Sequence, residues 1–92
     1  MIQSFRHKGL DQFFLTGSRA GIQPRHANRL RLILARLRAS TGPRDMRLPS
    51  LDLHQLSGGR AGEWSVSVSG NWRVTFQFEG THEASVNYED YH

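Results

Sequence analysis

Residues 62–79 have the sequence G-E-W-S-V-S-V-S-G-N-W-R-V-T-F-Q-F-E, in which apolar and polar residues alternate almost without a break. Strict alternation is typical of β-strands with one buried and one exposed face. The pattern is interrupted at Gly70-Asn71, and both residue types tolerate the positive φ angles of tight hairpin turns. We therefore expect a β-hairpin whose apolar face joins the core and whose polar face is open to solvent, with Arg73 as its single cation.

Two helices are expected before this hairpin. Leu10, Phe13 and Phe14 recur at helical spacing, and Gly17 is a plausible helix stop. A longer helix is predicted from Pro24 to Ser40, because proline suits the first turn and an apolar stripe follows at the i, i+3, i+4, i+7 positions Leu30, Ile33, Leu34 and Leu37.

Further strands flank these elements. Residues 2–5 alternate and predict a short strand, and residues 51–56 favour a strand or an extended segment. Residues 83–88 alternate again, which predicts Ala84, Val86 and Tyr88 facing the core and Glu83, Ser85 and Asn87 facing solvent. Strands joined by tight turns pair antiparallel, and only the two helices can cover the apolar face. The sequence thus predicts one α+β domain over residues 1–92, with a wet, concave second sheet face.

Composition narrows the classes of function. The 92 residues contain no cysteine, which excludes disulfides and thiolate metal sites and fits a reducing cytoplasm. No apolar run approaches membrane-spanning length, so we expect an intracellular protein without a membrane partner. Ten of the twelve Lys and Arg residues fall within residues 1–47, and eleven of the twelve are Arg. Arginine binds phosphate with two-point geometry, which favours a nucleic-acid partner; a solvated basic face is the alternative.

A few residues could carry chemistry over the polar face. His54 and Arg60 precede the hairpin, Arg73 lies on it, and Tyr91 and His92 follow the last predicted strand, which should pair beside residues 72–79. RNA is cleaved when its 2′-OH attacks the adjacent phosphate, which needs a base, an acid and cations. Histidine suits proton transfer near neutral pH and arginine suits the phosphate. No metal is required, and the chain offers no convincing metal-ligand cluster.

Each of these residues also has an ordinary structural explanation. A single histidine in a small domain is usually a surface residue, and Arg73 could be a simple exposed strand residue. Trp64 and Trp72 share a face with valine and phenylalanine, which favours core packing over base stacking. The residues by themselves therefore favour an RNA-binding or RNA-cleaving domain without deciding between the two.

Four blocks resemble the HigB toxins, a branch of the RelE/ParE superfamily of type II toxin–antitoxin systems. They are M-I-Q-S-F-R-H-K-G-L (1–10), L-H-Q-L-S-G-G-R-A-G-E-W-S-V (53–66), N-W-R-V-T-F-Q-F (71–78) and N-Y-E-D-Y-H (87–92). The resemblance implies an α+β, RelE/ParE-like fold with a curved antiparallel sheet of four to five strands packed on two N-terminal helices. It also implies a ribosome-dependent mRNA interferase that cuts message in the A site of the 70S ribosome. A HigA-like helix-turn-helix antitoxin would neutralise it, and operator DNA would be reached only through that antitoxin.

The resemblance also carries functional positions over to this chain. The family's catalytic positions match His54, Arg73, Tyr91 and His92, and Arg60 lies in a shared block for which we expect contact with RNA. The basic helix would contact ribosomal RNA through Arg25, Arg29 and Arg36. No metal and no cofactor are implied.

This chain departs from the family pattern at two positions. Relatives often carry Lys at the position of Ser57, and several carry a basic residue between Ser65 and Ser69, where this strand has only serine and valine. Two cations near the phosphate are therefore missing. The rival hypotheses are a ParE-like toxin that inhibits DNA gyrase without cleaving RNA, and a plain RNA-binding domain.

Overall fold

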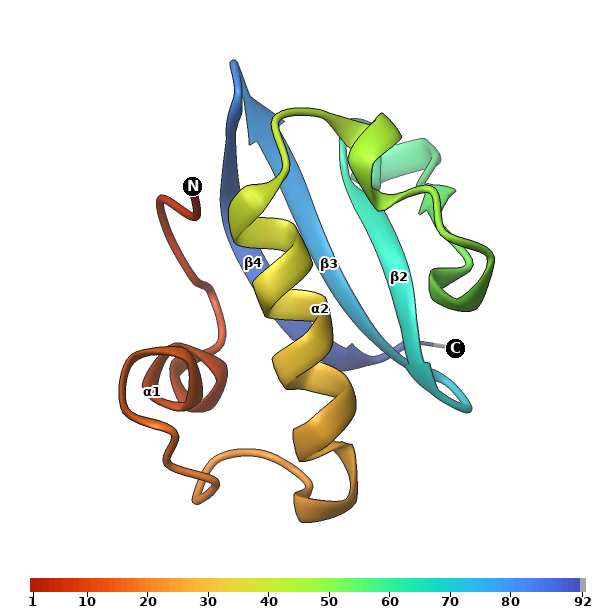
Figure 1. Cartoon of the computed structure of the whole chain (residues 1–92). Coiled ribbons are helices and arrows are strands. Elements are labelled where there is room, and N and C mark those ends of the chain that lie inside the picture. Colours follow the sequence, from red (N-terminus) through yellow and green to blue (C-terminus); the bar gives the residue numbers. More distant parts are fainter. Residues whose placement is uncertain (92) are drawn as a thin grey trace.

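The computed structural model describes residues 1–91 and shows a four-stranded antiparallel sheet with two helices on one side. The strands β1 (His54–Gln55), β2 (Trp64–Ser69), β3 (Trp72–Glu79) and β4 (His82–Asp90) are adjacent in chain order. Helix α2 (Ala27–Ala39) lies across the sheet, and α1 (Lys8–Thr16) lies beside it on the β4 side (Figure 1). The predicted α+β class is confirmed, with four strands in the sheet.

The predicted hairpin is the centre of the sheet. Strands β2 and β3 pair with Trp64 opposite Phe76 and Val66 opposite Val74, and a two-residue loop joins them. Gly70 in this loop has φ +56°, a value that glycine adopts without steric cost. Val66, Val74 and Phe76 are fully buried, so the apolar face joins the core as expected.

The buried face of helix α2 is the predicted apolar stripe. Its first turn is the 3₁₀ helix η1 (Pro24–His26), and the α-helix then runs to Ala39, with Ser40 as its C-cap. The side chains of the stripe are at most 2% exposed: Leu30, Ile33, Leu34 and Leu37. Burying each such side chain contributes about 1.5–3 kcal/mol, which is why this face decides where the helix lies.

Helix α1 begins and ends at local signals. The His7 ring accepts a hydrogen bond from the Leu10 amide (3.0 Å), and Gly17 closes the helix in the left-handed conformation. Gly9 packs directly against the loop before η1, because a Cβ on Gly9 would lie 2.4 Å from the carbonyl oxygen of Gly21. Backbone meets backbone at this contact, and no side chain larger than hydrogen fits.

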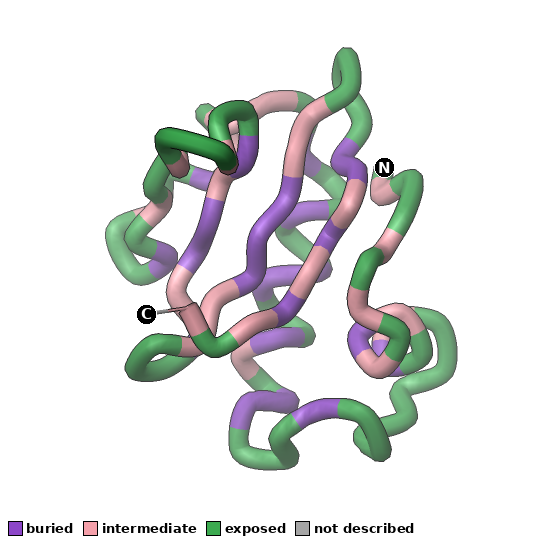
Figure 2. Tube along the Cα trace, turned by 180° about the vertical axis from the view of Figure 1, so that it is seen from behind, coloured by how far each residue is buried: buried purple, intermediate pink, exposed green. Residues whose placement is uncertain are grey.

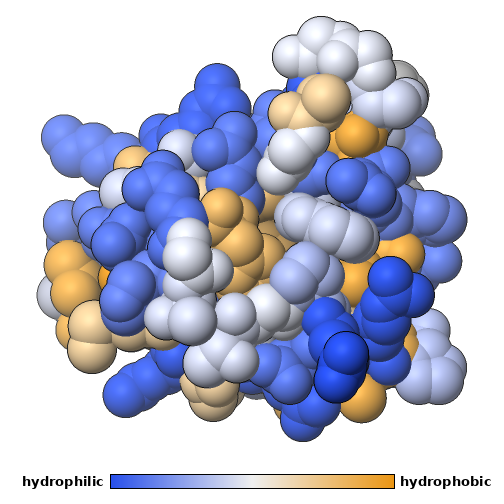
Figure 3. All heavy atoms as spheres, turned by 90° about the horizontal axis from the view of Figure 1, so that it is seen from above, coloured by the Kyte–Doolittle hydropathy of each residue, from blue (hydrophilic) through white to orange (hydrophobic). Residues whose placement is uncertain are grey.

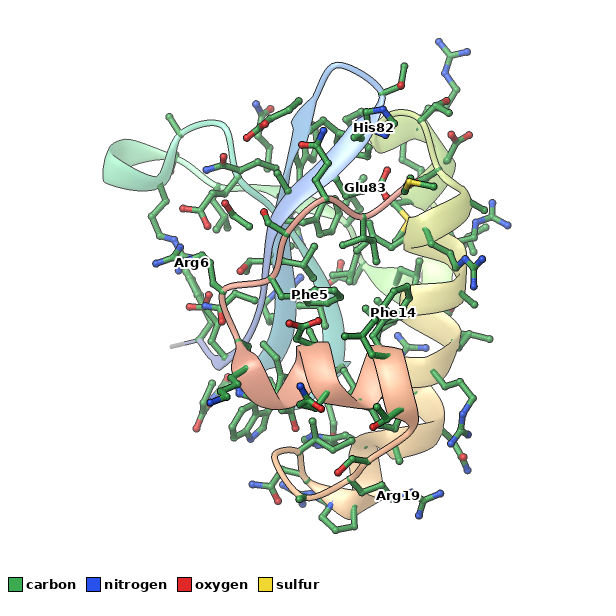
Figure 4. All side chains as sticks on the ribbon, turned by 90° about the vertical axis from the view of Figure 1, so that its left-hand side faces the viewer. Phe5, Arg6, Phe14, Arg19, His82 and Glu83 are labelled. Atoms are coloured by element: carbon green, nitrogen blue, oxygen red, sulfur yellow. The ribbon has the colours of Figure 1, made fainter. Side chains whose placement is uncertain are left out.

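The N-terminal segment differs from the prediction. Residues 2–5 form only two isolated parallel bridges to β4, from Ile2 to Glu83 and from Phe5 to Val86. The segment is extended and hydrogen-bonded to the edge of the sheet, but it does not form a strand. Phe5 turns toward Phe14 of α1, with ring centroids 5.4 Å apart, and so fastens the helix to the sheet edge (Figure 4).

A bulge in β4 changes which side chains face the core, compared with the predicted alternation. Gln77 pairs with Ala84 and Thr75 pairs with Asn87, so β4 contains one more residue than β3 between these pairs. Ser85 absorbs the extra residue with φ +54°. Glu83 therefore lies opposite Phe78 on the helix side of the sheet, and Ala84 lies on the other side, the reverse of the prediction for both residues.

The inward-facing Glu83 side chain is fully buried but not isolated. Its Oε1 lies 3.3 Å from the Met1 amino nitrogen, and its Oε2 lies 3.5 Å from the Ser40 hydroxyl. A buried carboxylate is tolerated only with such partners. The edge segment and the end of α2 thus meet at this carboxylate.

The polar face of the sheet is less open than predicted. Ser65 and Thr75 are 1% and 0% exposed, and the middle of the strands is buried when the sheet is viewed from behind (Figure 2). The reason is that long polar side chains bond to these hydroxyls and cover them. Seen from above, the surface is mostly hydrophilic, with apolar patches between the polar side chains (Figure 3).

No helix within residues 1–91 has both the length and the apolar character needed to cross a bilayer.

Candidate active site

A pocket of about 260 Å³ opens on the polar side of the sheet. It is lined by His54, Leu56, Ser65, Arg73 and Tyr91. Three of the four predicted catalytic residues therefore meet in one pocket, although they come from widely separated parts of the chain. The fourth, His92, lies outside the described residues.

Strand pairing explains this convergence. His54 on β1 lies opposite Ser65 on β2, and Arg73 on β3 lies opposite Ser67. At the end of β4 the Tyr91 amide donates a hydrogen bond to the Asn71 carbonyl (2.8 Å), which holds this residue at the hairpin turn. Each contributing segment is thus fixed by backbone bonds to its neighbour.

Arg73 is held firmly at the base of the pocket. Its Nε donates to the Ser65 hydroxyl (2.8 Å) and its Nη2 donates to the Asp52 carbonyl (2.9 Å). The side chain is only 16% exposed. A guanidinium has five N–H groups, and these two bonds leave donors that no described residue uses. The group is therefore positioned in advance to bind an anion.

His54 has a partner that the sequence analysis did not single out. Its Nε2 lies 3.1 Å from the Asp52 Oδ1, and both side chains are about 60% exposed. The Asp52 carboxylate also lies 3.9 Å from the Arg73 Nη2. The signal was present in the sequence, since an acid two residues before a candidate histidine can reach the same ring.

The Arg60 guanidinium is bound by two carboxylates in the folded chain. Its guanidinium donates four hydrogen bonds to two carboxylates, from Nε and Nη2 to Glu63 (3.1 and 2.8 Å) and from Nη1 and Nη2 to Glu89 (2.8 and 2.9 Å). It also lies over the Tyr91 ring at 5.3 Å. Two acids balance the charge of Arg60, and its guanidinium lies against the Tyr91 ring; its contact with RNA stays a prediction.

The electrostatics of this cluster follow from these bonds. Hydrogen bonds from Arg60, above all, hold the pKa of Glu89 and of Glu63 below the ordinary range. Hydrogen bonds to Glu89 and then Glu63 raise the pKa of Arg60 in turn. Glu89 also accepts from Thr75 (2.9 Å) and Asn87 (3.1 Å), so one carboxylate joins β3 and β4 beneath Tyr91.

Two of the three arginines predicted to bind RNA on the basic helix already donate hydrogen bonds within the protein. Arg29 donates from Nε and Nη2 to the Ser67 carbonyl (3.3 and 3.0 Å) and from Nη2 to the Ser50 carbonyl, so it is a structural tie between α2 and β2. Arg36 remains exposed, although its Nε donates to the Asp45 carbonyl (2.9 Å). Arg25 is exposed at the start of the helix. Arg29 would have to give up these bonds to contact nucleic acid, whereas Arg25 and Arg36 are exposed, and the contacts of all three stay predictions.

Within residues 1–91 we find no group of three or more His, Asp or Glu side chains that could hold a metal ion. The chemistry available in the described pocket consists of an imidazole, a guanidinium, a phenol and a serine hydroxyl. This set can bind a phosphate and move a proton.

Comparison with known proteins places the chain in a family. A family model described as the RelE-like toxin of type II toxin–antitoxin system HigB matches residues 3–92. The chain therefore belongs to the HigB-like toxins. It is also 39% identical over 92 residues to the endoribonuclease HigB of Proteus vulgaris, a match that covers 100% of both chains. Membership of this family implies that an antitoxin is its partner.

Proposed function

We propose that this toxin is an endoribonuclease that cleaves mRNA in the A site of the translating 70S ribosome. The observation that carries the proposal is the meeting of His54, Arg73 and Tyr91 in one pocket on the sheet. Support comes from the full-length relative in Proteus vulgaris, which is named an endoribonuclease. A gyrase inhibitor or a plain RNA-binding domain would have no need for an imidazole beside an anchored guanidinium.

The reaction is transfer of the phosphate to the ribose of the preceding nucleotide. The 2′-oxygen forms a bond to phosphorus as its proton passes to a base, and the bond from phosphorus to the 5′-oxygen breaks as an acid protonates that oxygen. The free N–H groups of Arg73 bind the non-bridging oxygens, whose negative charge grows in the transition state. His54 and His92 share the proton transfers, and Tyr91 positions the substrate.

The size of the pocket favours a substrate that another molecule presents. About 260 Å³ lies below the roughly 300–1,000 Å³ typical of pockets that enclose a whole small ligand. It suits a phosphate and the sugar next to it, but not a codon. The ribosome would hold the message and splay it out, so the toxin needs no base-reading pocket of its own.

The partners follow from this mode of action. The exposed arginines Arg25 and Arg36 of the basic helix would contact ribosomal RNA. A HigA-like helix-turn-helix antitoxin would neutralise the toxin and carry the complex to operator DNA. The site of action is the cytoplasm, where messages are translated.

Mapping of message ends tests the proposal. In a purified translation system, the toxin should produce discrete cuts within translated frames, and Arg73→Ala should lower the cleavage rate by at least 100-fold. Arg47→Ala removes an exposed arginine and serves as the charge-matched control. Intact messages together with inhibited DNA supercoiling would replace the proposal with the gyrase alternative.

A further inference from the structure

Asp52 adopts a backbone conformation that is uncommon for its residue type. Its φ and ψ are 49° and 59°, in the left-handed region, at the end of the 3₁₀ helix η3 (Pro49–Leu51). Among the described residues other than glycine, only Ser85 shares a positive φ, and the β4 bulge accounts for it. An aspartate in the left-handed conformation can simply cap a helix, but Asp52 lies directly beside the pocket.

The left-handed turn lets one residue reach both reactive groups. The Asp52 carbonyl accepts a hydrogen bond from the Arg73 Nη2 (2.9 Å), while its carboxylate oxygen Oδ1 lies 3.1 Å from the His54 Nε2. An ionised carboxylate only accepts hydrogen bonds, so the proton between these two atoms belongs to Nε2. In the neutral ring the other nitrogen, Nδ1, then carries the lone pair.

We propose that Asp52 is a positioning residue that holds His54 as the Nε2–H tautomer and thereby makes its Nδ1 the base for the 2′-OH. The inference rests on the proposed endoribonuclease function and assigns one of its two proton transfers. The 2′-O–H bond breaks, the proton joins Nδ1, and the electron pair left on oxygen forms the bond to phosphorus. The Asp52 carboxylate stabilises the resulting imidazolium. The proton for the 5′-oxygen comes from a different group.

The solvent exposure of Asp52 and His54 distinguishes a role in positioning the base from a role in stabilising the fold. With about 60% of each side chain exposed, the pair of Asp52 and His54 contributes little to folding, since exposed ion pairs are worth about 0–1 kcal/mol. Its removal should therefore change the chemical step while leaving the fold and substrate binding nearly unchanged. The hydrogen bond from the Arg73 Nη2 to the Asp52 carbonyl (2.9 Å) does not depend on the side chain, and the carboxylate itself lies farther from that nitrogen, at 3.9 Å.

Two substitutions preserve the backbone while altering the carboxylate. Asp52→Gly removes it, and glycine adopts the left-handed conformation freely. Asp52→Asn keeps the shape and tolerates the same conformation, but its amide can donate to Nε2 and so stabilise the opposite tautomer. We expect kcat on programmed ribosomes to fall about 10-fold in Asp52→Gly and further in Asp52→Asn, with KM within twofold of the wild type. Glu79→Gln, at the exposed end of β3, is the charge-matched control.

A spectroscopic measurement tests the tautomer without any cleavage. At a pH high enough for the ring to be neutral, the ¹⁵N shifts of His54 should report protonated Nε2 in the wild type and a mixture of tautomers in Asp52→Asn. Identical ring shifts in the two proteins would overturn the proposal, as would kcat within twofold of wild type in both variants. A parallel rise in KM with a lower melting temperature would also overturn it, because it would show that Asp52 only shapes the loop. A wild-type toxin that cleaves no message would refute the endoribonuclease function and leave the tautomer result standing.

Discussion

Replacing Arg60 by alanine should leave two carboxylates side by side without a counter-charge. Glu63 and Glu89 each accept two hydrogen bonds from Arg60, and their side chains are only 12% and 24% exposed. Removing one partner from a fully buried ion pair costs about 3–5 kcal/mol. Arg60 itself is 32% exposed, so water replaces part of what is lost, and we expect about 2–3 kcal/mol at pH 7. That is a large share of the roughly 5–14 kcal/mol typical of a chain this long.

The loss should depend on pH in a definite direction. The folded-state pKa values of Glu63 and Glu89 lie below the ordinary glutamate value of about 4.5, chiefly because Arg60 donates hydrogen bonds to both. The ion pairs therefore contribute stability that is fully present above about pH 4.5 and is lost as the pH falls through the folded-state values. The difference between wild type and Arg60→Ala should accordingly shrink to less than half of its neutral-pH value in strong acid.

Urea unfolding followed by tryptophan fluorescence measures both quantities. Arg47→Ala, which also removes one exposed positive charge, should unfold within about 0.5 kcal/mol of the wild type. Adding Glu89→Gln to Arg60→Ala should restore part of the stability, because it removes one unpaired charge. A free-energy difference that stays the same from neutral to acid pH would show that Arg60 acts by packing and not through its two carboxylates.

Three more results are expected. Gly9→Ala should destabilise the fold by about 1–3 kcal/mol in thermal or urea unfolding, because its Cβ would lie 2.4 Å from the Gly21 carbonyl oxygen. Gly42→Ala is the control, since nothing lies within 4 Å of a Cβ there. Equal effects of the two substitutions would refute the role of the contact. Burial lowers the pKa of His26, so the stability that the neutral ring contributes should be fully present above about pH 6.5 and should decline below it. His26→Leu should flatten this pH dependence of the unfolding free energy. Ser57→Lys, at an exposed residue next in the chain to Leu56 of the pocket lining, should tighten ribosome binding and steepen log K against log salt by about 0.7–0.9; an unchanged slope would place the residue away from phosphate.

The features predicted correctly from the sequence are those encoded by neighbours along the chain. The hairpin turn at Gly70-Asn71 and the α2 stripe each follow from a local period, and burial of one face then dictates how the layers pack. The gathering of His54, Arg73 and Tyr91 followed once adjacent strands were assumed to pair antiparallel. These inferences needed no knowledge of side-chain contacts between distant residues.

The features that were missed depend on choices made in three dimensions. Alternation continues through Ser85 in the sequence, so nothing local distinguishes a bulged strand from a straight one. Arg29 and Arg60 have the same composition signal as any exposed arginine, and only the folded chain shows that carbonyls and carboxylates have already taken their donors. The spacing of Asp52 and His54 is visible in the sequence, but the left-handed backbone of Asp52 is visible only in the folded chain.

Ser85 is an extra residue in β4, and it shifts the pairing of every later residue with β3 by one position. Extending the pairing of Phe78 with Glu83 straight along the two strands would place Arg73 opposite Tyr88, whereas Arg73 actually faces Glu89. Deleting Ser85 would therefore make β4 regular without changing the later pairs: Thr75, Val74 and Arg73 would still face Asn87, Tyr88 and Glu89. The pocket should therefore survive the loss of this residue, because Glu89 and Tyr91 would keep the surface that they already occupy.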